Sequence, residues 1–133
     1  MASLLLISVV DDDDSVRESL QRLLRSAGFA VQVFATAEEF SKSAHLHETR
    51  CLVLDVRMPA MDGFELFREL RKSNSGVPVV FITAHGNEAA RLQALNEGAI
   101  DYLYKPFSEE ALLRAIETAL RLEAIKTQSH VGK

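Results

Sequence analysis

Short apolar runs alternate with polar turns and helical patterns along almost the whole chain, and this alternation limits the possible folds severely. The first run, Leu4 to Val10, is nearly continuous, which is typical of a strand covered on both faces. Four similar runs follow at residues 29–34, 51–54, 78–83 and 100–104. A strand, a turn and a helix that repeat in this way predict βαβ units. We therefore expect an α/β domain built on a parallel sheet.

Capping residues mark where the predicted helices begin. Ser15 is expected to cap the first helix, and Gly28 to end it. Thr36 and Glu39 match a capping box, in which each side chain accepts a hydrogen bond from the other residue's backbone N–H. Asp62 is interpreted as a turn residue without a functional role. Later caps and stops are predicted at Asn87, Gly98 and Ser108.

The length of 133 residues predicts one domain, which we place at residues 1–123. Residues 124–133 are polar and aperiodic toward their end, and are expected to form a C-terminal tail or the start of a linker. Hydrophobic residues make up 47% and charged residues 26% of the chain, as in ordinary globular domains. Intrinsic disorder is therefore a poor interpretation.

The net charge and the cysteine content indicate which binding partners and which cellular compartment to expect. The chain has 15 Lys and Arg against 19 Asp and Glu, a net charge of −4, which is the wrong sign for neutralising nucleic-acid phosphates. Cys51 is the single cysteine, and no signal peptide or membrane-length apolar run is apparent. We expect a cytoplasmic domain that binds neither a membrane nor, by itself, nucleic acid.

Polar side chains follow four of the predicted strands. Asp11 and Asp12 follow the first, Asp55 the third, Thr83 ends the fourth, and Lys105 follows the fifth. In an open parallel sheet, ligands bind outside the carboxyl ends of the strands. Three carboxylates at this edge would repel one another unless a hard divalent cation such as Mg²⁺ took their oxygens as ligands. A nearby lysine would balance the remaining charge.

A solvated acidic run is the alternative interpretation of the aspartates at 11–14. Asp13 and Asp14 fit that interpretation, as exposed or helix-capping residues. Asp11 and Asp12 fit it less well, because an aspartate, a threonine and a lysine stand at three other strand ends.

Four ordered motifs carry a family resemblance, namely Val10–Asp12, Leu54–Gly63, Phe81–Gly86 and Asp101–Phe107. With them the chain resembles the receiver domain of two-component response regulators, and most resembles receivers of LuxR-type transcriptional regulators. The resemblance covers Leu4 to about Leu122. It implies a flavodoxin-like, doubly wound (βα)5 three-layer sandwich whose five parallel strands lie in the order 2-1-3-4-5.

The resemblance also implies a reaction. Asp55 would accept a phosphoryl group as a carboxylate nucleophile. Asp11, Asp12, Asp55 and the backbone carbonyl of Arg57 would hold Mg²⁺, for which Mn²⁺ is expected to substitute. The metal and Lys105 would offset charge that develops on the phosphoryl oxygens. Such a domain is not a turnover enzyme, but it catalyses its own phosphorylation and dephosphorylation.

Signalling roles follow from the same resemblance. Thr83 would bond a phosphoryl oxygen and Tyr102 would follow it inward, which changes the surface of the fourth helix and fifth strand. Arg57 and His85 are expected to tune the lifetime of the phosphoryl group. The Lys105–Pro106 peptide bond is expected to be cis.

The resemblance also implies binding partners, and alternative functions stand beside it. A sensor histidine kinase would supply the phosphoryl group, phosphorylation would promote a homodimer, and DNA contact would come only through a separate C-terminal effector domain. The alternatives are a stand-alone receiver or interaction module, a haloacid-dehalogenase-type aspartyl-phosphate hydrolase, and a flavodoxin-like cofactor carrier. The hydrolase needs an aspartate where Arg57 stands, and the carrier needs a phosphate-binding loop where Asp11 to Asp14 stand.

Overall fold

The computed structural model describes residues 4–131, with side chains through residue 122. Strands and helices alternate along this part of the chain, as the sequence predicts. The elements are β1 Leu6–Val10, α1 Asp14–Ser26, β2 Ala30–Phe34, α2 Ala37–Ser41, a 3₁₀ turn Leu46–Glu48, β3 Thr49–Asp55, α3 Gly63–Lys72, β4 Val79–Thr83, α4 Glu88–Asn96, β5 Asp101–Tyr104 and α5 Glu109–Val131.

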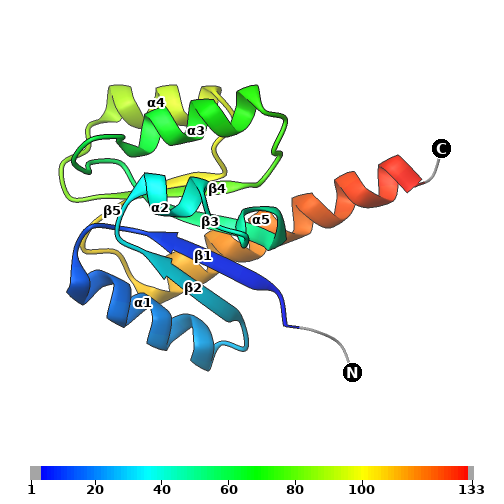
Figure 1. Cartoon of the computed structure of the whole chain (residues 1–133), viewed down its shortest axis with the longest axis horizontal. Coiled ribbons are helices and arrows are strands. Elements are labelled where there is room, and N and C mark those ends of the chain that lie inside the picture. The colour runs from blue at the N-terminus through cyan, green and yellow to red at the C-terminus, as the bar shows by residue number, and fades with distance from the viewer. Residues whose placement is uncertain (1–3, 132–133) are drawn as a thin grey trace.

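The five strands form one parallel sheet in the order β2-β1-β3-β4-β5, so the predicted topology is confirmed (Figure 1). Val10 pairs with Leu54 across β1 and β3, and Asp55 pairs with Ile82 across β3 and β4. This register places the residues that end β1, β3 and β4 side by side at one edge of the sheet. Helices bridge the strands, as parallel crossovers require.

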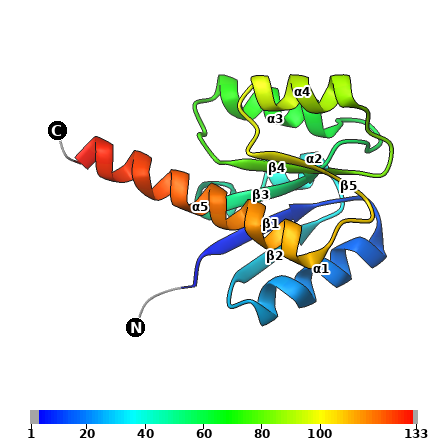
Figure 2. The ribbon, with the colours of Figure 1, turned by 180° about the vertical axis from the view of Figure 1, so that it is seen from behind.

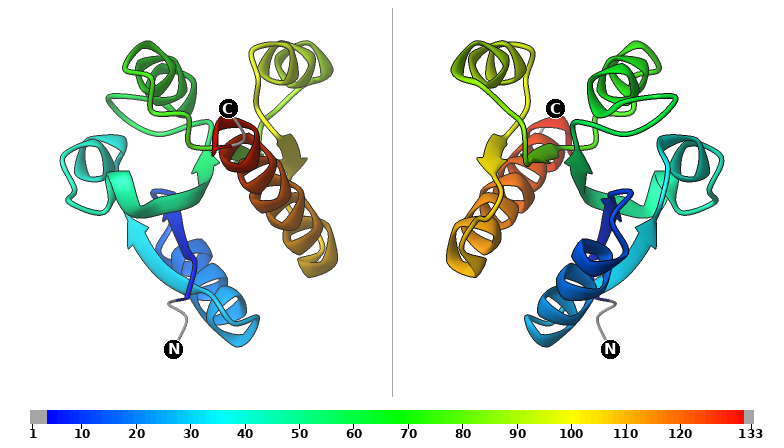
Figure 3. Two further views of the ribbon diagram at one scale, coloured as in Figure 1. Left: turned by 90° about the vertical axis from the view of Figure 1, so that its right-hand side faces the viewer. Right: turned by 90° about the vertical axis from the view of Figure 1, so that its left-hand side faces the viewer.

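Helices cover both faces of the sheet, which explains the nearly continuous apolar runs of the central strands. Helices α2, α3 and α4 lie on one face, and α1 and α5 on the other (Figures 1, 2 and 3). The core under α2, α3 and α4 includes Val10, Phe40, Leu52, Leu54, Leu66, Phe67 and Phe81. The core under α1 and α5 includes Ile7, Val9, Leu24, Val53, Val80, Ile82, Leu112 and Ile116.

The N-cap of helix α1 is Asp13 and not Ser15, the residue that the sequence predicts. Asp13 has extended backbone, and its side chain accepts hydrogen bonds from the backbone N–H groups of Ser15 and Val16. The prediction of Ser15 as the cap is therefore wrong, while the capping role suggested for Asp13 is confirmed. A carboxylate at this position also interacts favourably with the positive end of the helix dipole.

The capping boxes differ from the expectation as well. The Thr36 hydroxyl accepts from Glu39 N–H, but the Glu39 carboxylate accepts from that hydroxyl and not from the Thr36 backbone. Only half of the predicted box is therefore present. Asp62 and Glu65 make a complete one at the start of α3, so Asp62 is a helix cap as well as a turn residue.

Helix α5 extends to Val131 and projects past the sheet in Figure 1, whereas the sequence predicts an aperiodic end. Residues 124–131 are helical, and the assignment of residues 124–133 as a tail or linker stays a prediction. No helix within the described residues is long and apolar enough to cross a membrane. The Lys105–Pro106 bond is cis, as predicted.

Candidate functional site

An acidic cluster lies at the carboxyl edge of the sheet. Asp11 directly follows β1 and Asp55 ends β3, and the pairing of these two strands brings the carboxylates together. Asp12 completes the group, since one carboxylate oxygen from each of the three lies within 4.8 Å of the others. The structure therefore brings together the three aspartates that the sequence selects.

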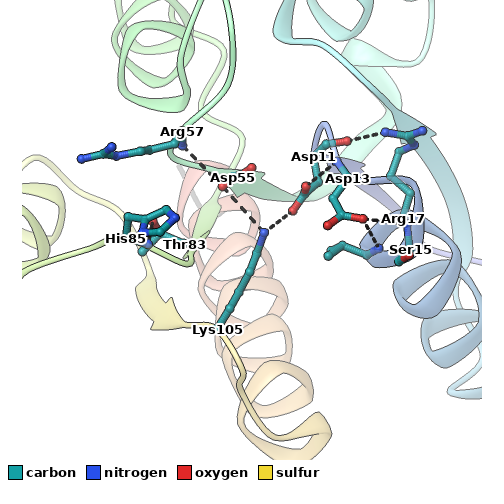
Figure 4. Close-up of polar contacts among 10 residues, drawn as sticks. Asp11, Asp13, Ser15, Arg17, Asp55, Arg57, Thr83, His85 and Lys105 are labelled. Carbon is teal, nitrogen blue, oxygen red and sulfur yellow. Dashed lines mark hydrogen bonds and ion pairs between the residues drawn. The ribbon is translucent and has the colours of Figure 1, made fainter.

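Asp11 is fully buried, and both of its carboxylate oxygens are engaged. Oδ1 accepts from the Asp13 backbone N–H at 2.9 Å, and Oδ2 accepts from Lys105 Nζ at 2.8 Å (Figure 4). The same ammonium lies 3.9 Å from Asp55 Oδ1. Lys105 thus stands between the two buried carboxylates and partly compensates their charge.

Two backbone contacts position this edge of the sheet. The Lys105 N–H donates to the Thr83 carbonyl oxygen at 2.8 Å, which joins the chain after β5 to the end of β4. On the other side, the start of α3 packs directly on the backbone of Asp55. A Cβ on Gly63 would collide with the Asp55 carbonyl oxygen, so this close approach needs a glycine.

Asp55 is 4% exposed, and this burial is the main reason that its pKa is raised from 3.8 to about 7. The negative charge of Asp11 raises the Asp55 pKa further. Lys105 and a hydrogen bond from the Arg57 backbone N–H, at 3.4 Å, lower it and only partly offset the increase. The Asp55 carboxylate is therefore undercompensated by the protein's own charges.

These residues fit a hard divalent cation. Two buried carboxylates and one exposed one offer oxygen ligands within reach of a single ion, and the protein supplies too little positive charge of its own. The Asp12 carboxylate is exposed and makes no hydrogen bond to the described residues, so it is free to act as a ligand. The role of the Arg57 backbone carbonyl as a further metal ligand stays a prediction.

Thr83 ends β4 and is fully buried, and its hydroxyl accepts from the His85 backbone N–H at 3.1 Å (Figure 4). Arg57 and His85 follow Asp55 and Thr83 by two residues, and both are exposed. They lie at the rim of the acidic cluster in Figure 4, where the lifetime hypothesis places them. That placement does not test their kinetic role.

Tyr102 on β5 is 3% exposed, so its ring already lies inside the domain. Its hydroxyl is buried, and no group of the described residues meets it at standard hydrogen-bond geometry. Burial is the main cause that raises the Tyr102 pKa, and the nearby Asn87 backbone N–H lowers it in part. A Cβ on Gly86 would lie 2.5 Å from the Tyr102 hydroxyl and 2.7 Å from Thr83 Cγ2. Gly86 is therefore the residue that makes room for the buried tyrosine.

Sequence reasoning missed Gly86 and Arg17. The Arg17 guanidinium reaches back from α1 to the Asp11 carbonyl oxygen at 2.8 Å. An arginine in the first turn of a helix, just after an acidic run, is the signal that would have indicated this contact. The close approach of Gly86 to Tyr102 depends on the pairing of β4 with β5 and has no local signal.

Comparison with protein families identifies one model that covers most of the chain. The model described as the response regulator receiver domain matches residues 7–117. Among curated relatives, the response regulator protein TodT of Pseudomonas putida is 41% identical over 116 residues, which are 87% of this chain and 51% of TodT. The transcriptional regulatory protein FixJ of Bradyrhizobium diazoefficiens is 41% identical over 115 residues, covering 86% of this chain and 56% of FixJ.

Solved structures show the same relationship. The response regulator StyR superposes with a TM-score of 0.89 at 48% identity, covering 98% of this chain and 66% of StyR. FixJ-N superposes with a TM-score of 0.78 at 37% identity, covering 91% of this chain and 96% of FixJ-N. The chain spans about half the length of the curated relatives TodT and FixJ.

Proposed function

The chain belongs to the response regulator receiver domain family, and on this premise we propose that it accepts a phosphoryl group on Asp55 in a Mg²⁺-dependent reaction. One observation carries the proposal. Asp55 is buried at the end of β3, its carboxylate oxygen is 3.9 Å from Lys105 Nζ, and one oxygen each of Asp11, Asp12 and Asp55 lies within 4.8 Å of the others, so that the three could share a cation. The proposed phosphoryl donors are a sensor histidine kinase and small phosphodonors.

In the proposed reaction, a carboxylate oxygen of Asp55 attacks the phosphorus atom and forms an acyl phosphate. The bond from phosphorus to the donor's nitrogen or oxygen breaks, and its electron pair leaves with the donor. Asp11, Asp12 and Asp55 would hold Mg²⁺, which supplies positive charge beside the phosphoryl oxygens when bound. Lys105 would turn its ammonium from Asp11 and Asp55 toward a phosphoryl oxygen.

Thr83 would act after the transfer, when its hydroxyl, whose oxygen accepts from the His85 N–H, donates its proton to a phosphoryl oxygen. The phosphorylated side chain would carry a charge of about −2 in place of the carboxylate, which would change the packing at Thr83, Gly86 and Tyr102. Helix α4 and strand β5 carry this change to the surface, where Leu92 and Tyr104 are exposed. We propose this surface as the face of a phosphorylation-promoted homodimer.

Regulation of transcription is the output that we propose for the whole protein. The support comes from FixJ, which is a transcriptional regulatory protein and of which this chain resembles about half. DNA contact would then belong to an effector domain, because this domain carries a net charge of −4. A stand-alone receiver is the alternative. A cytoplasmic location and a sensor histidine kinase as partner stay predictions.

The residues of the site argue against two of the alternatives, the aspartyl-phosphate hydrolase and the flavodoxin-like cofactor carrier. A haloacid-dehalogenase-type hydrolase needs a carboxylate two residues after the nucleophile, and here Arg57 occupies that position. A flavodoxin-like carrier needs a loop that attracts phosphate after β1, and here four aspartates occupy it.

The test is the intact mass of the protein after incubation with acetyl phosphate, with and without Mg²⁺. Wild type is expected to gain one phosphoryl group only with the metal, and Asp55→Asn to gain none. Asp13→Asn is the matched control, because Asp13 belongs to the same acidic run but caps α1, a role that asparagine retains. Undiminished labelling of Asp55→Asn would refute the assignment of the acceptor.

A further inference from the structure

Arg17 ties the loop between β1 and α1 together at two points. Its Nη1 donates to the Asp11 backbone carbonyl oxygen at 2.8 Å, and its Nη2 pairs with the carboxylate of Asp14. The Arg17 side chain is only 17% exposed, although it is charged and lies near the start of a helix. Figure 4 shows the guanidinium turned back toward the end of β1 instead of toward solvent.

With Arg17 in place, every polar group of Asp11 is occupied. Its N–H donates to the Phe34 carbonyl oxygen at 3.1 Å, its carbonyl accepts from Arg17, and its two carboxylate oxygens accept from Asp13 N–H and Lys105. Among the described residues, Arg17 therefore supplies the one hydrogen bond to the Asp11 carbonyl, at the peptide unit that leads directly into Asp12.

Three of the four consecutive aspartates have partners, and these partners differ. Asp11 pairs with Lys105, Asp13 caps α1, and Asp14 pairs with Arg17. Asp12 alone makes no side-chain hydrogen bond to the described residues, and it is the exposed member of the acidic cluster. The loop thus presents one free carboxylate to the site out of four that are adjacent in sequence.

We infer that Arg17 is the positioning residue that selects Asp12 as the free metal ligand of this acidic run. It does so by fixing the Asp11 carbonyl and by holding Asp14 away from the cluster. The inference rests on the proposed Mg²⁺ site. Arg17 touches neither the phosphoryl group nor the metal in this role, so its effect on both is indirect.

Charge and position predict opposite effects when Arg17 is removed. A cation near a metal site repels the metal, so its removal would strengthen Mg²⁺ binding if charge alone mattered. Loss of the two contacts would instead leave the Asp11–Asp12 peptide and Asp14 free to move. The ligands would then be held less well in the geometry that Mg²⁺ requires, and Mg²⁺ affinity would fall. The sign of the change in affinity therefore separates the two explanations.

The experiment is a calorimetric Mg²⁺ titration of the 133-residue chain and three variants. Arg17→Ala is expected to weaken Mg²⁺ binding about tenfold, the lower end of what loss of a ligand-orienting contact costs. Arg17→Lys keeps the charge but lacks the planar fork, and is expected to weaken binding less than Arg17→Ala does. Arg22→Ala removes an exposed arginine from the same helix and is expected to bind like wild type.

Two further readouts show whether position is the cause. Amide exchange at Asp13, whose N–H donates to Asp11 Oδ1, should become faster in Arg17→Ala. The Mg²⁺ concentration that half-saturates labelling by acetyl phosphate should rise in this variant, while the rate at saturating Mg²⁺ stays near that of wild type. Circular dichroism checks that the variants are folded, and Arg17→Lys carries the test if Arg17→Ala is not.

The outcomes separate this inference from the proposed function. Wild type that binds no Mg²⁺ would refute the metal site itself. Wild type that binds Mg²⁺, with Arg17→Ala binding equally or more tightly, would leave the site standing and overturn the role of Arg17. If Arg17→Ala does not fold, Arg17→Lys with the affinity of wild type would overturn that role too.

Discussion

The two halves of the sheet edge differ in how completely their polar groups are paired. Around Asp11 and Lys105, each buried polar group has a partner, and the chain is held by contacts from β2, α1 and the loop after β5. Around Tyr102, a buried hydroxyl has no partner at standard hydrogen-bond geometry among the described residues, and Ala94 is the one buried residue of the adjacent α4. The first half is suited to chemistry that needs fixed geometry, and the second to a change of conformation.

The largest effect is expected from Lys105→Met, which breaks the charge pairing of the first half. Two buried carboxylates would lose their cation, which costs about 3–5 kcal/mol of folding stability without metal. Phosphorylation from acetyl phosphate should slow by about two orders of magnitude, as expected when a group that stabilises developing charge is removed. Urea unfolding and the time course of intact mass measure the two effects. Labelling at the wild-type rate would show that Lys105 does not assist the transfer.

The charge of Asp55 should make stability depend on pH. The pKa of Asp55 is raised to about 7 in the folded chain, so the folded state binds its proton more tightly than the unfolded state does. This stabilisation is present below pH 4 and is lost as the pH rises toward 7. Without metal, Asp55→Asn should therefore be more stable than wild type at pH 8, by on the order of 2 kcal/mol.

Urea unfolding of wild type and Asp55→Asn at several pH values tests this expectation. Mg²⁺ should reduce the difference at pH 8, because a bound cation stabilises the wild-type carboxylates. A stability difference that does not change between pH 4 and pH 8 would show that Asp55 is not a destabilised carboxylate.

Gly86→Ala is expected to disturb only the second half. The new methyl group would lie 2.5 Å from the Tyr102 hydroxyl, so the ring must move outward or the loop must shift. We expect a loss of about 1–3 kcal/mol and a more exposed tyrosine, with phosphorylation of Asp55 retained. Ring signals of Tyr102 in NMR spectra report its environment. If the Tyr102 ring stays buried in Gly86→Ala and the variant is as stable as wild type, Gly86 is not required for the burial of Tyr102.

The smallest effects are expected from substitutions at the rim of the acidic cluster. Replacement of Arg57 or His85 by alanine should change the lifetime of the phosphorylated form about fivefold, equivalent to ~1 kcal/mol in the barrier, because both side chains lie at the rim where water would approach the phosphorus. Loss of the phosphorylated mass with time measures this. Lifetimes equal to that of wild type in both variants would remove these residues from the mechanism.

The sequence predicts the fold and the edge of the sheet well, because long apolar runs mark the strands and polar residues mark their ends. It predicts the first helix cap poorly. The end of the apolar run at Val10 locates Asp11 and Asp12 correctly, but four consecutive aspartates give no local signal of which one caps the helix. The burial of Tyr102 is likewise set by strand pairing and by Gly86, which periodicity does not reveal.

Thr83→Ala tests most directly whether chemistry and switching are separate. The same samples would be measured by intact mass and by amide exchange over residues 88–104, before and after treatment with acetyl phosphate and Mg²⁺. We predict that Thr83→Ala gains the phosphoryl group as wild type does, but that its exchange over α4 and β5 changes far less. An exchange response equal to that of wild type in the phosphorylated variant would contradict the account.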